Sequence, residues 1–264
     1  MPPTDASAGT GPGSVPLHPG VARTWDIQGT GDQGAWDEGA GDTASFGDGE
    51  DTLDLRLPDE FLAQFAAPRL ADGLDDLLDH IPTWGPTPTP VGMFQLVPVR
   101  LEHDLPLVRS WMNDPAVAPF WELAGSHNRT ESHLRAQIDG DGRSTPCLGM
   151  LDGTPMSYWE IYRADLDPLA RHYPARPHDT GIHLLIGDAA DRGRGLGSAL
   201  LRAVADLVLD RRPTCARVVA EPDLRNTPSV AAFLSAGFRF AAEVDLPGKR
   251  AALMIRDRVL RGLM

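Results

Sequence analysis

The chain has 264 residues, with 24 lysines and arginines against 37 aspartates and glutamates, which gives a formal net charge of −13 at pH 7. The acidity is local, because residues 1–90 hold 16 acidic and three basic residues whereas residues 91–264 hold 21 of each. A neutral folded region without a basic stripe argues against nucleic acid as a partner. Neither a membrane-spanning apolar run nor a secretory signal is evident, so we expect a cytoplasmic protein without a membrane partner.

Residues 1–90 are expected to lie outside the main folded domain. Residues 1–52 are rich in Gly, Pro, Asp and small side chains, a composition typical of a disordered arm. Residues 53–90 are expected to form short helices and a Pro-rich linker. Apolar residues recur there at helical spacing as far as Leu78, Pro82 is expected to end the second helix, and Pro alternates with other residues over 85–90.

The folded domain is expected to span residues 91–264. Its predicted elements, in chain order, are a strand at 94–99, helices at 105–113 and 130–138, strands at 147–151 and 156–162, a loop at 165–180, a strand at 181–186, a helix after 197, a strand at 217–220, a helix at 227–236 and strands at 238–246 and 250–255. This order predicts an α+β fold with a central mixed, mostly antiparallel sheet flanked by helices. Cys147 and Cys215 lie in strand-like stretches and are expected to be buried free thiols.

A glycine-rich loop, Arg192-Gly193-Arg194-Gly195-Leu196-Gly197, lies between a strand pattern and an amphipathic helix pattern. Its glycines allow a tight turn and close approach of a ligand to the backbone. The free N–H groups at the following helix N-terminus favour an anion. Ser198 follows without the lysine of a P-loop, and the spacing and late position differ from a dinucleotide-binding fold. The pattern therefore predicts a phosphate or pyrophosphate site without naming the nucleotide, and a plain surface turn remains the alternative.

The sequence on both sides of this loop resembles the GNAT superfamily of acyl-CoA N-acyltransferases. Arg192-x-x-Gly195-x-Gly197 matches the pyrophosphate loop of that family, and Asn226 with Phe233 and Gly237-Phe238 resembles its second motif. The resemblance implies a sheet splayed between its fourth and fifth strands, with the pantetheine of acetyl-CoA or another acyl-CoA in the gap. It also implies a cofactor-binding set, namely Leu185, Ile186, Arg192, Gly193, Arg194, Gly195, Leu196, Gly197, Ser198, Asn226 and Phe233.

A closer resemblance is to the branch that acylates hydroxylamines in hydroxamate siderophore synthesis (aerobactin, mycobactin and desferrioxamine types). It is carried by six segments: 111–115, 119–123, 158–162, 171–174, 181–187 and 221–226. It implies acylation of N-hydroxylysine, N-hydroxyornithine or an N-hydroxy-diamine, and a protein partner from that pathway for the N-terminal region. Aminoglycoside-type acetyltransferases share part of these segments, so aminoglycoside-type N-acetylation is the alternative function. A second alternative is a GNAT-like binding module that has lost catalysis.

His183 and Asp223 are the predicted catalytic pair. His183 lies on the strand that enters the glycine loop, and Asp223 lies just past the next strand. In a GNAT fold both places border the thioester, so the histidine can act as general base while the carboxylate orients its ring or holds the substrate nitrogen. A hydrogen-bonded core histidine is the simpler interpretation. The predicted reaction is direct attack of nitrogen on the thioester, with backbone N–H groups near Leu185 and Ile186 polarising the carbonyl.

One position departs from the family pattern. Many GNAT enzymes place a tyrosine in the last core helix to protonate the leaving thiolate, whereas this chain has Phe233, which has no proton to donate. The thiolate then needs another acid, with charged His183 or water as candidates, or leaves unassisted.

The acceptor pocket is expected to involve Trp121, Glu122, Trp159 and Glu160, since glutamate can pair with a cationic amine and tryptophan can cover its stem. Core packing of the two tryptophans and a solvated face for the two glutamates are equally compatible with the pattern. No metal site is expected, because His172 and His178 lack further ligands.

Overall fold

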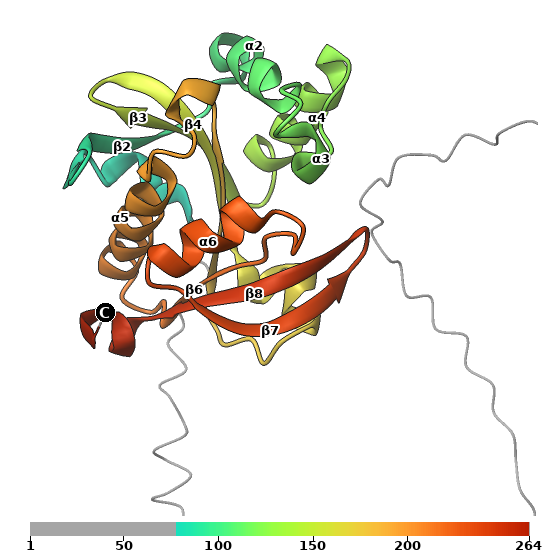
Figure 1. The fold of residues 1–264 in the computed structure, drawn as a ribbon. Helices are drawn as coiled ribbons and strands as arrows, with labels where there is room; N and C mark the ends of the chain where they lie inside the picture. Colours follow the sequence, from blue (N-terminus) through green and yellow to red (C-terminus); the bar gives the residue numbers. More distant parts are fainter. Residues whose placement is uncertain (1–77, 264) are drawn as a thin grey trace, which may run out of the picture. The chain divides into compact units, whose positions relative to one another are not determined.

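The computed structural model describes residues 78–263 (Figure 1). The acidic arm and the helices expected before residue 78 lie outside these residues. The first element is a 3-10 helix, η1 (Leu78–Thr83), which contains Pro82 instead of ending at it. Part of the expected linker forms a short strand, β1 (Thr87–Thr89), antiparallel to β2 (Gly92–Pro98). Pro88 is tolerated there because β1 is an edge strand and needs few ladder bonds.

The sheet has eight strands in the order β1-β2-β3-β4-β5-β6-β8-β7. The bounds of the others are β3 (Ser144–Leu151), β4 (Thr154–Arg163), β5 (Thr180–Ile186), β6 (Arg217–Ala220), β7 (Arg239–Leu246) and β8 (Lys249–Asp257). All neighbouring pairs are antiparallel except β5 and β6. The predicted mixed, mostly antiparallel sheet is therefore confirmed.

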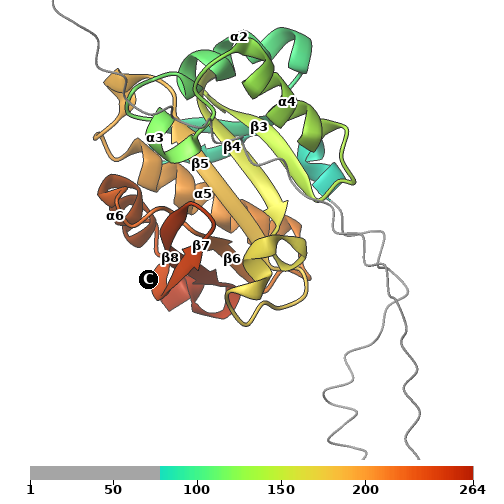
Figure 2. The same cartoon turned by 90° about the vertical axis from the view of Figure 1, so that its right-hand side faces the viewer.

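The sheet splits between β5 and β6. These strands pair only at Thr180 with Val218 and Gly181 with Val219, although β5 continues to Ile186. Counted from β2, they are the fourth and fifth strands, which confirms the splay predicted there. In Figure 2, β3, β4 and β5 run side by side, and β6, β7 and β8 make the other part of the sheet. Beyond Gly181, one backbone edge of β5 therefore has no strand beside it.

Helices cover both faces of the sheet (Figure 1). On one face, α2 (Leu101–Met112), α3 (Ala118–Trp121) and α4 (His127–Ile138) enclose a core that includes Tyr158 and Leu185. On the other face, α5 (Leu196–Arg211) and α6 (Thr227–Ser235) enclose a core that includes Trp159 and Ile182. Consecutive strand residues face opposite sides. Tyr158 and Trp159 thus belong to different layers of the domain.

Several element boundaries differ from those predicted. Helix α2 begins at Leu101 instead of 105, because Asp104 Oδ2 accepts a hydrogen bond at 2.8 Å from the backbone N–H of Arg100 and so caps an earlier start. The loop expected over 165–180 contains 3-10 turns, η2 (Ala164–Leu166) and η3 (Pro168–Arg171). Two more are η4 (Ala189–Asp191) and η5 (Arg258–Leu263). Both cysteines are buried and free, as predicted.

Candidate active site

His183 lies on β5 two residues beyond Gly181, the last residue paired with β6. On one side its Nδ1 is 2.9 Å from Oε2 of Glu160, the residue directly opposite it on β4. On the other side its Nε2 is 2.5 Å from Oε1 of Glu221, the residue that follows the end of β6 at Ala220. The second contact therefore bridges the split in the sheet near its closed end.

The Glu160 carboxylate is buried and fully engaged. Its Oε1 accepts hydrogen bonds from Tyr158 Oη at 2.9 Å and Gln137 Nε2 at 2.8 Å, and lies 2.5 Å from His133 Nε2. Two neighbouring turns of α4 supply His133 and Gln137, since residues four apart share one helix face. Glu160 is thus held in place by four side chains, of which His183 is one.

Glu221 is also buried and fixed from two directions. Its Oε2 accepts a 2.7 Å hydrogen bond from Tyr162 Oη, and Lys249 Nζ lies 3.7 Å from its Oε1 while donating to its backbone carbonyl at 2.8 Å. Gly181 makes room for Tyr162, because a Cβ at that position would fall about 2.0 Å from the tyrosine ring. The ring of Tyr162 in turn packs on His183 with centroids 4.8 Å apart.

The two carboxylates set the charge of His183. Burial lowers the pKa of its imidazole, but the negative charges and hydrogen bonds of Glu221 and Glu160 outweigh this and raise the pKa to about 10. Burial raises the pKa of Glu221, but the His183 charge outweighs it and brings the pKa to about 2. The pKa of Glu160 is held well below its usual value by His133 and His183 against the effect of burial. Near neutral pH both ring nitrogens of His183 therefore carry protons, and the predicted general base has no free lone pair in this arrangement.

Asp223 lies close to this group but does not contact His183. Its carboxylate accepts a hydrogen bond from Arg225 NH2 at 2.7 Å and two from Arg225 Nε at 3.1 Å. The Arg225 guanidinium is also the main reason that the pKa of Asp223 is lowered. The ring of His183 is therefore oriented by Glu160 and Glu221 instead of Asp223. The other role predicted for Asp223, contact with the substrate nitrogen, remains a prediction.

Trp121 and Glu122 border the same region from α3. The Trp121 ring is 6.0 Å from the His183 ring and 5.4 Å from that of Tyr158, edge-on in both cases. Glu122 ends the helix in a left-handed conformation, with φ 55°, and its side chain is exposed. It helps to raise the pKa of Arg225, for which Asp223 is the larger cause. Glu122 therefore lies near enough to Arg225, which follows β6 across the split, to act on its charge.

The two predicted acceptor residues on β4 have other roles. Trp159 is fully buried among the residues under α5, where its Nε1 donates to Ser157 Oγ at 2.9 Å. It has no surface to offer an acceptor, so the predicted contact is wrong and its role is packing. Glu160 faces His183, as strand alternation requires, but its oxygens are already occupied. Glu160 therefore positions His183 instead of pairing with a cationic amine.

The glycine loop has the geometry of an anion site. Gly193 and Gly195 have φ values of 71° and 80°, in the left-handed region that favours glycine, and Gly195 is the N-cap of α5. Within residues 78–263, the backbone N–H groups of residues 193–198 have no hydrogen-bond acceptor. A Cβ at either glycine would meet no other atom within 4 Å. The space beside the loop is open, and its residues fit a pyrophosphate held by backbone N–H groups.

The two arginines of the loop differ. Arg192 donates from Nε to the Ile186 carbonyl at 3.0 Å, from NH2 to the Gly187 carbonyl at 2.7 Å, and from NH1 and NH2 to the carboxylate of Asp114 at 3.0 and 3.1 Å. Its guanidinium ties the loop to β5 and to Asp114 after α2, although the family resemblance implied that Arg192 binds the cofactor. Arg194 has a 63% exposed side chain and a single contact at 3.3 Å, to Asp191, so it remains available.

The remaining predicted cofactor residues lie around the split. Asn226 is the N-cap of α6, where its side chain accepts a hydrogen bond from Ser229 N at 3.2 Å. Phe233 is 4% exposed and packs edge-on against Phe238. Leu185 and Ile186 lie on the part of β5 beyond the β6 pairing. Because successive N–H groups of a strand point to opposite edges, only one of these two can face the gap.

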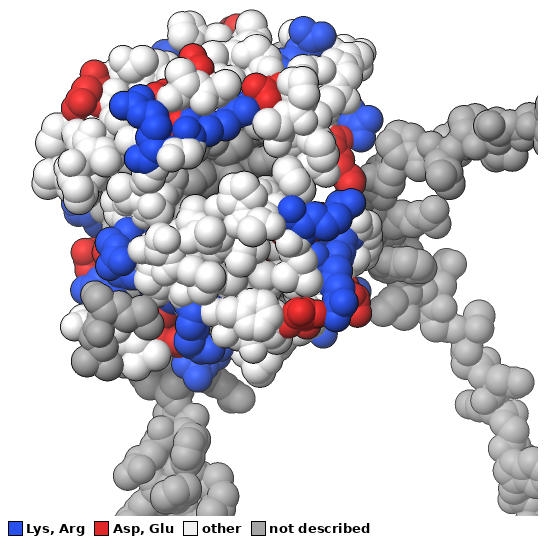
Figure 3. All heavy atoms as spheres, viewed as in Figure 1, with Lys and Arg blue, Asp and Glu red and all other residues white. Residues whose placement is uncertain are grey.

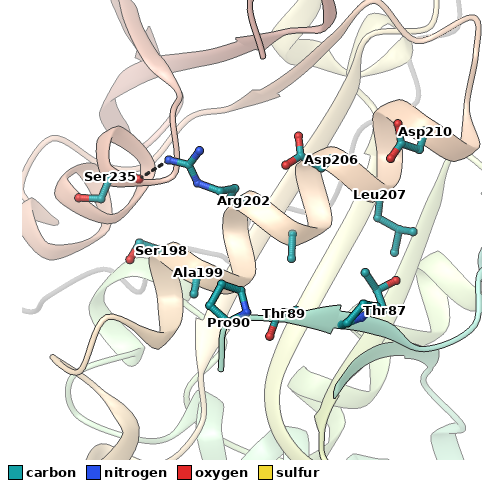
Figure 4. Close-up of a pocket in the computed structure, with 12 residues that line it drawn as sticks. Thr87, Thr89, Pro90, Ser198, Ala199, Arg202, Asp206, Leu207, Asp210 and Ser235 are labelled. Atoms are coloured by element: carbon teal, nitrogen blue, oxygen red, sulfur yellow. Dashed lines mark hydrogen bonds between the residues drawn. The ribbon is translucent and has the colours of Figure 1, made fainter. Parts of the chain in front are cut away.

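A separate groove of about 450 Å³ lies between β1, α5 and the end of α6 (Figure 4). Arg202 crosses it to donate to the Ser235 carbonyl at 3.0 Å, and Thr89 and Pro90 form the opposite wall. Ser198, which follows the glycine loop, lines this groove, and the cluster around His183 is not part of it. On the face shown in Figure 3, basic and acidic side chains are interspersed, and a hollow lies between a basic patch in the upper part and the uncharged surface over α6.

Four residues of the site were not identified from the sequence: Glu221, His133, Gln137 and Asp114. The spacing of His133 and Gln137 was the available signal, since it places two polar side chains on one helix face. Glu221 lies two residues before the predicted Asp223, but only the pairing of β6 with β5 brings it to His183. Among residues 78–263, no group of three His, Cys, Asp or Glu side chains is arranged to hold a metal, and no helix is long and apolar enough to cross a bilayer.

The mixed sheet splits beside a glycine loop at a helix N-terminus, and a histidine lies where the two parts of the sheet separate. These features together define a GNAT-type acyl-CoA N-acyltransferase. Residues 100–246 match the family described as acetyltransferase (GNAT) domain, and the chain belongs to this family. It is similar to a lysine N-acyltransferase of Mycobacterium sp. (strain MCS), at 36% identity over 72% of this chain and 78% of the relative. An N(6)-hydroxylysine O-acetyltransferase of Escherichia coli is 37% identical over 56% of this chain and 47% of its own length.

Solved structures show the same fold. An uncharacterized protein of Bacillus halodurans superposes with a TM-score of 0.64 at 33% identity, covering 68% of this chain and 92% of that one. The aminoglycoside acetyltransferase AAC(6')-Ib, solved with an aminoglycoside and acetyl-CoA, superposes with a TM-score of 0.56 at 25% identity, covering 63% and 94%. Acyl-CoA N-acyltransfer is therefore the activity of this class of fold and site.

Proposed function

We propose that this enzyme transfers an acyl group from acyl-CoA to the hydroxylamine nitrogen of an N-hydroxylated lysine, ornithine or diamine, in hydroxamate siderophore biosynthesis. The observation that carries the proposal is His183, held between Glu160 and Glu221 at the split in the sheet, with Trp121 and Asp223 beside it. The names of the relatives, which act on lysine and hydroxylysine, support this class of acceptor.

The donor is proposed to bind along the split. The N–H groups of residues 193–198 receive the pyrophosphate, with Arg194 adding positive charge, and Asn226 lies across the gap at the start of α6. The pantetheine then follows the unpaired edge of β5 beyond Gly181. This route brings the thioester toward His183, and one N–H of residues 185 and 186 is placed to polarise its carbonyl.

The acceptor is proposed to enter between α3 and the segment after β6. Trp121 covers the apolar stem of the acceptor, while Glu122 and Asp223 provide negative charge for its nitrogen atoms. A hydroxylamine is much less basic than an alkyl amine and is mostly neutral at cellular pH. It can therefore attack the thioester without first losing a proton, and positioning supplies much of the rate.

Two rival functions predict different products. Aminoglycoside acetylation is suggested by the AAC(6')-Ib likeness, but that likeness is 25% in identity against 36% for the mycobacterial lysine N-acyltransferase. Transfer to oxygen is suggested by the name of the Escherichia coli relative. An N-acylated hydroxylamine is a hydroxamate, which forms a coloured complex with ferric iron, whereas the O-acyl isomer does not.

The test is to incubate the enzyme with acetyl-CoA and longer acyl-CoA donors and with each hydroxylamine, while thiol release and ferric-hydroxamate colour are recorded together. We expect both signals with at least one hydroxylamine and neither with kanamycin. Thiol release without colour indicates O-acylation, and release with kanamycin alone overturns the proposal. A chain that binds no CoA by calorimetry would restore the non-catalytic alternative.

A further inference from the structure

We infer that His183 donates the proton to the departing CoA thiolate, and that Glu160 and Glu221 are positioning residues which keep it in the imidazolium form. The inference deepens the proposed function and rests on it. It assigns to His183 the acid role that a tyrosine fills in many members of the family and that Phe233 cannot fill in this chain.

The protonated Nε2 of His183 lies where β5 and β6 separate. The bond from His183 Nε2 to Glu221 crosses from β5 to the end of β6, just where the two strands separate. A thioester that follows the free edge of β5 into the split would reach this bond, and we place its sulfur there as part of the inference. The side chain of His183 is 33% exposed, whereas those of Glu160 and Glu221 are 9% and 8% exposed. The histidine is thus the accessible member of the group, and the carboxylates are the fixed ones.

The surrounding charges favour the imidazolium. The groups that face His183 from other elements are Glu160 and Tyr162 on β4, Glu221 after β6, Trp121 on α3 and, electrostatically, Asp167 between η2 and η3. Lys249 and His133 affect His183 indirectly, because Lys249 contacts Glu221 and His133 contacts Glu160. With both ring nitrogens facing carboxylates, loss of either proton leaves one negative oxygen facing a ring lone pair, and the pKa of His183 accordingly rises to about 10.

The two neighbouring tyrosine hydroxyl groups already donate hydrogen bonds to the glutamates. Tyr158 Oη donates to Glu160 and Tyr162 Oη donates to Glu221, and burial is the first reason that the pKa of each tyrosine lies well above its usual value. Neither can release a proton at neutral pH as readily as His183. The Phe233 ring, across the split on α6, adds only apolar surface.

The proton balance closes without another reactant. The hydroxylamine nitrogen forms a bond to the thioester carbon, which gives a tetrahedral intermediate with a positive nitrogen and a negative oxygen. When that intermediate collapses, the carbon–sulfur bond breaks and the thiolate takes the proton of His183. The proton on nitrogen then returns to the imidazole. The products are the hydroxamate and free CoA thiol, and His183 is again an imidazolium.

The test is the pH dependence of turnover in Glu221→Gln. Removing one carboxylate lowers the pKa of His183 by about 1–3 units. For a proton donor, activity near pH 9 must then fall, because less of the imidazole carries its proton, and the ratio of variant to wild-type kcat/KM must rise again as pH is lowered to neutral. For a general base, the same variant must gain activity near pH 9, because more of its imidazole is free. The two roles therefore predict opposite signs.

Glu243→Gln on β7 is the matched control, since its carboxylate is exposed and pairs with Arg250 instead of His183. Its pH profile should match the wild type. His183→Gln should lose about 10²–10⁴-fold in kcat with CoA binding retained, which is the usual contribution of a general acid. Nitrogen-15 NMR of the histidines provides a readout without turnover, since at pH 9 His183 should show two protonated ring nitrogens in the wild type and be partly or fully deprotonated at one of them in Glu221→Gln.

Each outcome separates the inference from the proposed function. Wild-type enzyme that acylates no hydroxylamine overturns the proposed function, whatever the NMR shows. Wild-type enzyme that is active, but whose Glu221→Gln variant keeps its rate near pH 9 or gains, overturns the inference alone. A neutral His183 ring in the wild-type spectrum overturns it as well.

Discussion

Arg192 in the glycine loop forms a two-pronged ion pair with Asp114, which follows the end of α2 and lies 78 residues earlier in the chain. The same guanidinium holds the carbonyls of Ile186 and Gly187 at the end of β5. Gly187 is itself in close contact with Trp111, because a Cβ there would fall about 2.2 Å from the indole. Arg192 thus fixes the glycine loop to the end of α2, although its guanidinium does not face the phosphate site.

Asp114→Asn is therefore expected to weaken CoA binding although Asp114 contacts no part of the proposed CoA site. The amide cannot match the charge and geometry of the two-pronged contact, so Arg192 and the loop lose their fixed position. We expect the Kd for CoA, measured by calorimetry, to rise several-fold. Arg192→Gln should have a similar effect, and the double variant should be no worse than either single one. Additive losses would show that Arg192 also touches the ligand.

Gly195→Val should abolish CoA binding while leaving the fold intact. The φ of 80° disfavours any side chain, at a cost of about 1–2 kcal/mol, and the added carbons enter the space beside the N–H groups. Gly248→Val is the matched control, because Gly248 has φ 88° and equally open space but lies in the β7–β8 hairpin. The control should lose similar stability in thermal unfolding and keep its CoA affinity. If both variants bind CoA, the pyrophosphate is held elsewhere.

Much of the fold followed from local patterns. The alternation and helical spacing that define β4, β5 and α5 are properties of short windows, and the loop with its glycines at left-handed φ values is equally local. The place of the split followed from the family resemblance. The helix starts at Leu101 and His127 were missed by a few residues. At Leu101 the aspartate that accepts from the Arg100 N–H lies inside the helix instead of before it, and at His127 the N-cap Ser126 makes no side-chain cap hydrogen bond.

The site was only partly accessible from sequence because it depends on which side chains the split sheet brings together. His183 was identified, but its carboxylate partners are Glu160, from the neighbouring strand, and Glu221, from across the split. Strand alternation separates Trp159 from Glu160 once the direction of either is known, yet the sequence alone does not provide that direction. Arg192 resembles a phosphate ligand in its motif, and only its distance to Asp114 shows that it is an anchor.

Asp223→Asn should impair use of the acceptor and not of the donor. Its carboxylate stays ionised, since its pKa is lowered chiefly by Arg225, and the asparagine keeps its size while removing the charge proposed to hold the substrate nitrogen. We expect the KM for the hydroxylamine to rise by about 10-fold or more, which corresponds to one charge-assisted hydrogen bond, with the CoA Kd unchanged. Asp245→Asn, at a 91% exposed position on β7, is the matched control. A change in CoA affinity instead would move Asp223 to the donor side.

The charge of His183 should also appear in the pH dependence of folding. A group whose pKa is raised on folding, here from 6.5 to about 10, stabilises the protein fully below its unfolded value and loses that effect as pH rises through the folded value. Glu221 acts in the opposite sense, since its pKa falls from 4.5 to about 2 and its contribution is lost only as pH falls through that range. The cluster is therefore most stabilising between about pH 4.5 and 6.5.

Between pH 6.5 and 8.5 the free energy of unfolding in urea should consequently decrease, with a slope that approaches one proton bound on folding. His183→Gln removes the titrating group and should flatten this slope, although its stability at pH 6.5 is lower than that of the wild type. His172→Gln, on the exposed segment after η3, should leave the slope unchanged. A wild-type slope that survives His183→Gln would show that another group takes up the proton, and that the two carboxylates do not hold His183 in its charged form.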